Sequence, residues 1–186
     1  MVRPGAPALT DNVSGRPDTG IKPADPAGTA LARRSVESWK DPDWQRLWLT
    51  IEKQSWHTLS IIPAGEGADP DFTISLAVTL SRTGMTHLGR PIQVADGTQV
   101  ALSQLNGFLM DVQACTSAGD RLLVALPPIT SSPTAPAIAK ATDAAVLCVL
   151  MERMSWVQGR QTLKLVGASR FLGSIIIKPD GSPSGR

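Results

Sequence analysis

Residues 60–84 read SIIPAGEGADPDFTISLAVTLSRTG and are the most informative segment of the chain. An apolar run leads into a Gly-rich loop, and the segment after the loop has helical character. Asp69 suits the N-cap of that helix, Pro70 its first position and Gly84 its C-terminal end. A strand, a Gly-rich loop and a helix form the setting of a phosphate-binding loop, in which backbone N–H groups hold an anion. Because a Gly-rich turn before a helix is also common, this stretch alone leaves an ordinary strand-to-helix connection open.

Strand-like and helix-like segments alternate along the rest of the chain. Continuous apolar strands separated by helices are typical of a parallel sheet buried on both faces. Right-handed crossovers then place helices on both sides. We therefore predict an α/β three-layer sandwich with a parallel sheet of about five strands. The expected strands begin at His57, Pro91, Arg121, Ala145 and Phe171, and the expected helices at Asp43, Pro70, Val100, Ala135 and Ser155.

Composition indicates one soluble domain with tails. The chain has 186 residues, of which 42% are hydrophobic and 18% charged, so it can bury a core. We expect a disordered Pro/Gly-rich tail over residues 1–38, a domain over 39–178 and a flexible tail over 179–186. No apolar run approaches the roughly 20 residues of a membrane helix, and the N-terminus lacks the apolar segment of a signal peptide. These features predict a cytoplasmic protein.

Charge and cysteine content argue against a nucleic-acid-binding protein and against a disulfide-stabilised one. The net charge is +2, which gives no strong field toward nucleic acid, membranes or acidic substrates. Basic residues are spread along the chain, so we expect no nucleic-acid partner. Cys115 and Cys148 lie in apolar or helix-like runs and are predicted to be buried thiols, not a disulfide or a nucleophile.

The loop lacks the residues that phosphoryl transfer needs. A working loop supplies a Lys to the β- and γ-phosphates and a Ser or Thr to Mg²⁺. Here the Lys position is Ala, the hydroxyl position is Asp or Pro, and the loop offers three acids and no cation, so a triphosphate would be repelled. The vestigial phosphate-loop positions are Gly65, Glu66, Gly67, Ala68 and Asp69, with Asp71 as the third acid.

Taken together, these segments resemble the bacterial tyrosine kinase family of exopolysaccharide and capsule synthesis, whose relatives are the MinD/ParA-type ATPases. The family pattern SPGPGEGKST followed by NLAVALAQAG corresponds to residues 60–84. Its Asp-rich magnesium strand corresponds to IQVADGTQV, with Asp96 as the only acid, and its strand ending in DTPP corresponds to LLVALPP, with Ala125 in place of the metal-binding Asp. The resemblance implies strand order 2-3-1-4-5.

The departures from the family pattern agree with one another. The phosphate Lys, the Mg²⁺ hydroxyl and the third-strand Asp are all absent, and the chain has no Tyr for the family's autophosphorylated cluster. We therefore expect no enzymatic activity, no cofactor and no metal. His57 and His87 have no partners at metal-ligand spacing. Ser131, Ser132 and Thr134 are predicted to cap the next helix.

The family's N-terminal helix carries an acid and two Arg residues used in ring assembly. The matching positions are Asp43, Arg46 and Leu49, so one Arg is missing. Trp44 and Trp48 flank this row of residues. They either pack the helix onto the sheet or, with Arg46, form an exposed partner or oligomer surface; the sequence leaves both open.

The resemblance implies a non-enzymatic function. The chain would be a degenerate ATPase-like scaffold or regulatory subunit of a bacterial exopolysaccharide, capsule or cellulose system. Its partners would be a membrane-embedded synthase or co-polymerase, with associated cytoplasmic subunits and a homo-oligomer as further options, and it would lie at the inner membrane through that partner. Two alternatives remain open: an unusual nucleotide or small-ligand sensor, and a ParA-like DNA-positioning protein.

Overall fold

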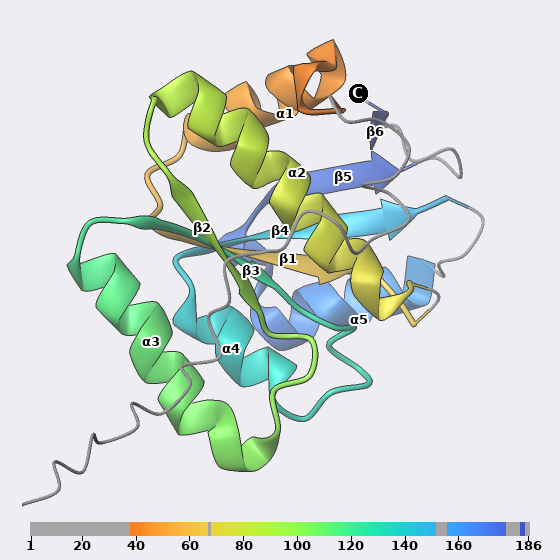
Figure 1. Ribbon diagram of the computed structural model, residues 1–186. Helices are drawn as coiled ribbons and strands as arrows, with labels where there is room; N and C mark the ends of the chain where they lie inside the picture. The colour runs from red at the N-terminus through yellow and green to blue at the C-terminus, as the bar shows by residue number, and fades with distance from the viewer. Residues whose placement is uncertain (1–37, 67, 152–155, 178–182, 185–186) are drawn as a thin grey trace, which may run out of the picture.

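The computed structural model describes residues 38–66, 68–151, 156–177 and 183–184 (Figure 1). Most of residues 1–38 and 179–186 therefore lie outside the described part, so the two predicted tails stay predictions. The strands are β1 (Thr58–Pro63), β2 (Ile92–Asp96), β3 (Arg121–Ala125), β4 (Ala144–Leu150), β5 (Phe171–Ile177) and β6 (Pro183–Ser184). The helices are α1 (Pro42–Glu52), α2 (Pro70–Leu88), α3 (Leu105–Ser117), α4 (Ala135–Ala141) and α5 (Trp156–Val166), with short 3-10 turns at Ser38–Lys40, Leu102–Gln104 and Ala168–Arg170.

The sheet has the order β2-β3-β1-β4-β5-β6. The first five strands in this order are parallel, and β6 adds an antiparallel edge. In Figure 1, α1 and α2 cover one face of the sheet, and α3, α4 and α5 cover the other. The predicted α/β sandwich and the strand order 2-3-1-4-5 are therefore confirmed, and β6 is an addition that the sequence did not indicate.

Each face of the sheet has its own apolar core, as expected for strands buried on both sides. The core under α1 and α2 contains Trp48, Leu59 and Leu80, and the core under α3 and α4 contains Val124 and Ile138. All five side chains are almost completely buried. The continuous apolar runs that predicted the strands thus follow from burial on both faces.

Gly84 does not end α2, contrary to our expectation. The helix continues to Leu88 and ends at Gly89, whose φ of 67° is left-handed and whose amide donates to the carbonyl oxygen of Met85 at 2.9 Å. Gly84 lies inside the helix, where the ring of Trp48 packs directly over it. A Cβ at this position would stand 2.6 Å from Cζ2 of Trp48. The glycine therefore provides close approach between α1 and α2, not a helix stop.

A cluster of polar and aromatic side chains fixes α1 to the sheet. The carboxylate of Glu52 accepts a hydrogen bond from Nε1 of Trp48 at 3.2 Å and forms an ion pair with Arg121 at 3.6 Å, and Nε2 of His87 lies 3.2 Å from it. The guanidinium of Arg121 lies 4.8 Å from the ring centroid of Trp56. This cluster joins α1, α2 and β3, which are distant in sequence.

Candidate functional site

The register of the sheet brings the predicted site positions to one edge. Ile61 pairs with Ala125, and Ala125 pairs with Asp96 on its other side. The carboxyl ends of β1, β3 and β2 therefore lie next to one another. In doubly wound sheets this edge is where ligands bind. The loop that follows β1 leaves the sheet here and leads into α2.

A side chain of α5 covers the first glycine of the loop. The amide of Ala64 continues the sheet by donating to the carbonyl oxygen of Cys148 at 2.8 Å. Gly65 is buried, and the side chain of Gln158 lies against it, so that a Cβ at Gly65 would stand 3.1 Å from Cδ of Gln158. A side chain of the protein therefore occupies the space over the first glycine of the loop.

The acids of the loop are held by neighbouring groups of the protein. The carboxylate of Glu66 accepts a hydrogen bond from the hydroxyl of Thr130, in the connection after β3, at 3.3 Å. Asp69 caps α2, because its carboxylate accepts from the amide of Asp71 at 3.1 Å. Asp69 is therefore the N-cap that the sequence predicted. Its negative charge stands at the helix terminus where an incoming phosphate would bind.

The two vestigial magnesium positions differ in their surroundings. Asp96 is exposed, and its carboxylate accepts from the amide and the hydroxyl of Thr98 at 2.9 and 2.6 Å. Ala125 is completely buried. The structure thus brings Asp96 and Ala125 side by side. The carboxylate of Asp96 closes a local turn, and Ala125, the residue paired with Asp96, has only a methyl side chain.

Three residues of this edge were missed by sequence reasoning: Gln158, Thr130 and Thr73. The hydroxyl of Thr73, in the first turn of α2, is buried and donates to the carbonyl oxygen of Leu126 at 3.1 Å. It ties the start of the helix to the end of β3. Because these contacts join segments that are distant in sequence, only the strand order could have indicated them.

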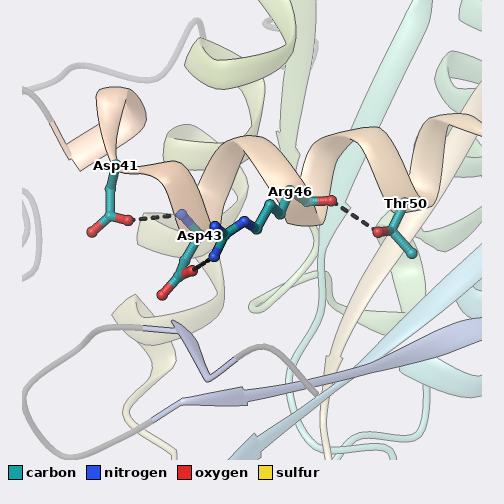
Figure 2. A network of polar contacts seen from close by, with 4 residues as sticks. All are labelled: Asp41, Asp43, Arg46 and Thr50. Atoms are coloured by element: carbon teal, nitrogen blue, oxygen red, sulfur yellow. Dashed lines mark hydrogen bonds and ion pairs between the residues drawn. The ribbon is translucent and has the colours of Figure 1, made fainter.

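The predicted partner surface on α1 needs a correction. Trp44 and Trp48 are only 5% and 1% exposed, so they pack the helix onto the sheet and cannot offer a surface to a partner. Arg46 is exposed, and its guanidinium binds Asp43 of the same helix at 3.1 Å. Figure 2 shows this pair between the N-cap Asp41 and Thr50.

The remaining candidate residues have structural surroundings. Within the described ranges, no group of three or more His, Cys, Asp or Glu side chains could hold a metal ion. Both cysteines are buried and free, as predicted. Burial raises the pKa of the Cys148 thiol, which disfavours its reactive thiolate form.

The Ser/Thr group before α4 caps that helix only in part. The hydroxyl of Ser132 accepts a hydrogen bond from the amide of Ala135 at 3.3 Å. Thr134 instead donates to the carbonyl oxygen of Val100 at 2.9 Å, and Ser131 donates to that of Pro128 at 3.0 Å. One of the three predicted residues therefore binds the helix N-terminus through its side chain.

Comparisons with known proteins bear on the fold. No protein-family model matches the sequence, and no curated protein matches it significantly. Among solved structures, the chain is similar to the crystal structure of the chimerical protein CapA2B2, with 13% sequence identity and a TM-score of 0.58. The likeness covers 77% of this chain and 87% of the other. It shows a shared α/β sandwich, consistent with a P-loop-like fold, and at this identity it shows the fold alone. No helix in the described part of the chain is long and apolar enough to cross a membrane.

Proposed function

We propose that this protein is a catalytically inactive, ATPase-like scaffold or regulatory subunit of a bacterial exopolysaccharide, capsule or cellulose system. The observation that carries the proposal is the set of contacts made by the loop after β1. Gln158 covers Gly65, Thr130 binds Glu66, and Asp69 holds the helix terminus. In the described part of the loop, Gly65, Glu66 and Asp69 therefore each contact another group of the domain.

Electrostatics support the loss of catalysis. Phosphoryl transfer depends on cations and Mg²⁺ that neutralise charge developing on the phosphate. The described part of the loop, residues 64–66 and 68–69, contains two acids and no Lys or Arg. Repulsion between the carboxylates Glu66 and Asp69 and a triphosphate would be costly at the intermediate dielectric of a protein surface. The domain would then act through its surfaces, and a partner would have to supply any conformational signal.

The assignment to polysaccharide synthesis rests on the motif order that resembles the bacterial tyrosine kinases, together with the confirmed strand order. The partner would be a membrane-embedded synthase or co-polymerase. Purification of the tagged protein from solubilised membranes of its source bacterium tests this assignment. We expect a glycosyltransferase or polymer-export protein to co-purify. Recovery of chromosome-partition proteins in its place would contradict the assignment.

A thermal-shift titration tests the inactive loop. ATP, ADP, GTP and cyclic dinucleotides are each added with and without Mg²⁺, and we expect no change in the melting temperature. A ligand at a hundredfold excess over its Kd would stabilise the fold by about 2.7 kcal/mol, which is readily measured. A shift with any nucleotide would favour the sensor alternative, and release of phosphate from ATP would overturn the proposal.

A further inference from the structure

The outer face of α5 carries exposed apolar and basic side chains. The inner side of the helix is buried through Gly159, Thr162 and Val166. The residues that face outward combine large apolar side chains with cations. They are Trp156, Val157, Arg160, Lys164 and Leu165, all of which are exposed. We call these five residues the α5 face.

Trp156 is the most exposed large apolar side chain of the α5 face. It is 79% exposed, whereas Trp44, Trp48 and Trp56 are each 5% exposed or less. Val157, the next residue, is 70% exposed. An indole has an apolar body and one N–H donor, so it is well suited to a boundary between an apolar phase and water. Its exposure here points to a surface that becomes covered.

The charge of the α5 face has one sign. The helix contains Arg160 and Lys164 and no acidic residue. These two cations are four residues apart, the spacing at which like charges destabilise a helix. A negatively charged surface placed over the α5 face would offset this repulsion. Although the net charge of the whole chain is small, positive charge is concentrated locally beside the exposed side chains of Trp156 and Val157.

A combination of Trp, aliphatic residues, Arg and Lys on one side of a helix is typical of helices that lie in the membrane interface. Cations bind the phosphate groups of anionic lipids, and Trp is enriched at the level of the headgroups. We propose that the α5 face binds anionic phospholipid headgroups, with Trp156 and Val157 entering the interface and Arg160 and Lys164 pairing with lipid phosphates. Because one short helix supplies the contact, binding is weak and reversible.

Flotation with lipid vesicles tests this proposal on the full-length protein. Vesicles of phosphatidylcholine are compared with vesicles that also contain phosphatidylglycerol. We expect binding only to the anionic vesicles and a loss of binding at high salt. The double variant R160E/K164E should bind at least about 25-fold more weakly, from roughly fivefold for each cation lost. Trp156→Ala should weaken binding several-fold.

Matched variants control for charge and apolar exposure. K53E/R90E makes the same change in net charge at exposed positions directly after α1 and before β2, and it should bind as the unchanged protein does. Met110→Ala removes a 71% exposed apolar side chain from α3 and should also have no effect. Trp fluorescence provides a second readout, because a shift of emission to shorter wavelength on adding anionic vesicles should disappear in Trp156→Phe.

Three results would overturn the lipid proposal. The first is no binding of the unchanged protein to phosphatidylglycerol vesicles, as expected if the α5 face instead receives an acidic protein. The second is equal binding to neutral and anionic vesicles. The third is equal weakening by R160E/K164E and K53E/R90E, which would assign the effect to net charge alone. Circular dichroism of each variant verifies that the domain remains folded.

Discussion

The side chain of Gln158, at the start of α5, lies directly against Gly65 in the loop after β1. A methyl group at Gly65 would stand 3.1 Å from Cδ and 3.5 Å from Cβ of Gln158. The contact couples the loop after β1 to α5, the helix that follows β4 in the chain. It also means that a larger residue at Gly65 must displace the Gln158 carboxamide.

Gly65→Ala should therefore lower the free energy of unfolding by about 1 kcal/mol, the lower end of the range for overpacking. The effect is modest because the carboxamide is the flexible end of its side chain. In the background of Gln158→Ala the same substitution should cost almost nothing. Urea denaturation of the four proteins in this double-mutant cycle gives the coupling energy. Strictly additive effects would show that the two residues do not touch.

Gly84→Ala should be more damaging, with a loss of about 3 kcal/mol. The new methyl group meets the packed rings and branches of Trp48 and Ile92 in the core, and neither can turn aside. Gly107 is the matched control, because it lies in α3, is exposed and would have nothing within 4 Å of an added Cβ. Gly107→Ala should stabilise the protein by roughly 0.5–1 kcal/mol through helix propensity. Thermal or urea unfolding measures both, and similar effects at the two sites would contradict the packing of α1 on α2.

Asp143 should contribute to stability in a pH-dependent manner. Partial burial favours a higher pKa, but hydrogen bonds from the amides of Thr58 and His57 outweigh it and lower the pKa of this carboxyl. Both amides donate to Oδ2, at 2.9 and 2.8 Å. A carboxyl whose pKa is lowered by folding stabilises the protein fully above its unfolded pKa of about 3.9, and this stabilisation is lost as the pH falls through the folded value.

The substitution Asp143→Asn isolates that charge, because the amide oxygen can still accept both hydrogen bonds. We expect the variant to be less stable than the unchanged protein at pH 7. The difference between the two should diminish as the pH falls below about 4, the ordinary range of an aspartate. Urea denaturation across this pH range measures it. A difference that stays constant down to strongly acidic pH would show that the charge of Asp143 has no part in the effect.

The two thiols should be unreactive in the folded protein. Cys148 is completely buried and Cys115 is 9% exposed. The pKa of Cys115 is raised by burial and by the nearby carboxylates Asp120 and Asp111. Because the thiolate is the reactive form, a thiol-specific chromogenic reagent at mildly alkaline pH should label neither residue quickly, and Cys115 before Cys148. In urea both should react at once. Rapid labelling of Cys148 in the folded state would contradict the position of β4 in the sheet.

The elements of the fold were predictable because their signals are local. The apolar runs of β1, β3 and β4 and the cap formed by Asp69 and Pro70 are features of short segments. The strand order is not local, and it came from the resemblance of the motifs. The sheet of this chain has that order.

The errors have non-local causes. Gly84 reads as a helix stop until the ring of Trp48, from another helix, is placed over it. Trp44 and Trp48 could be core residues or part of an exposed surface until α1 is docked on α2, and the packing alternative is the correct one. Nothing in the local sequence marks Gln158 as a site residue, because its contact with Gly65 depends on where α5 lies relative to the loop.

The carboxylate of Glu52 has a consequence for how the chain acquires its structure. It contacts His87 and Arg121, so the end of α1 reaches its final environment only after β3 has joined the sheet. The first helix, although it is near the N-terminus, therefore depends for part of its contacts on a strand that is distant in sequence. A chain that ends before Arg121 would lack the cation that pairs with Glu52 and lies against the rings of Trp48 and Trp56 in the complete domain.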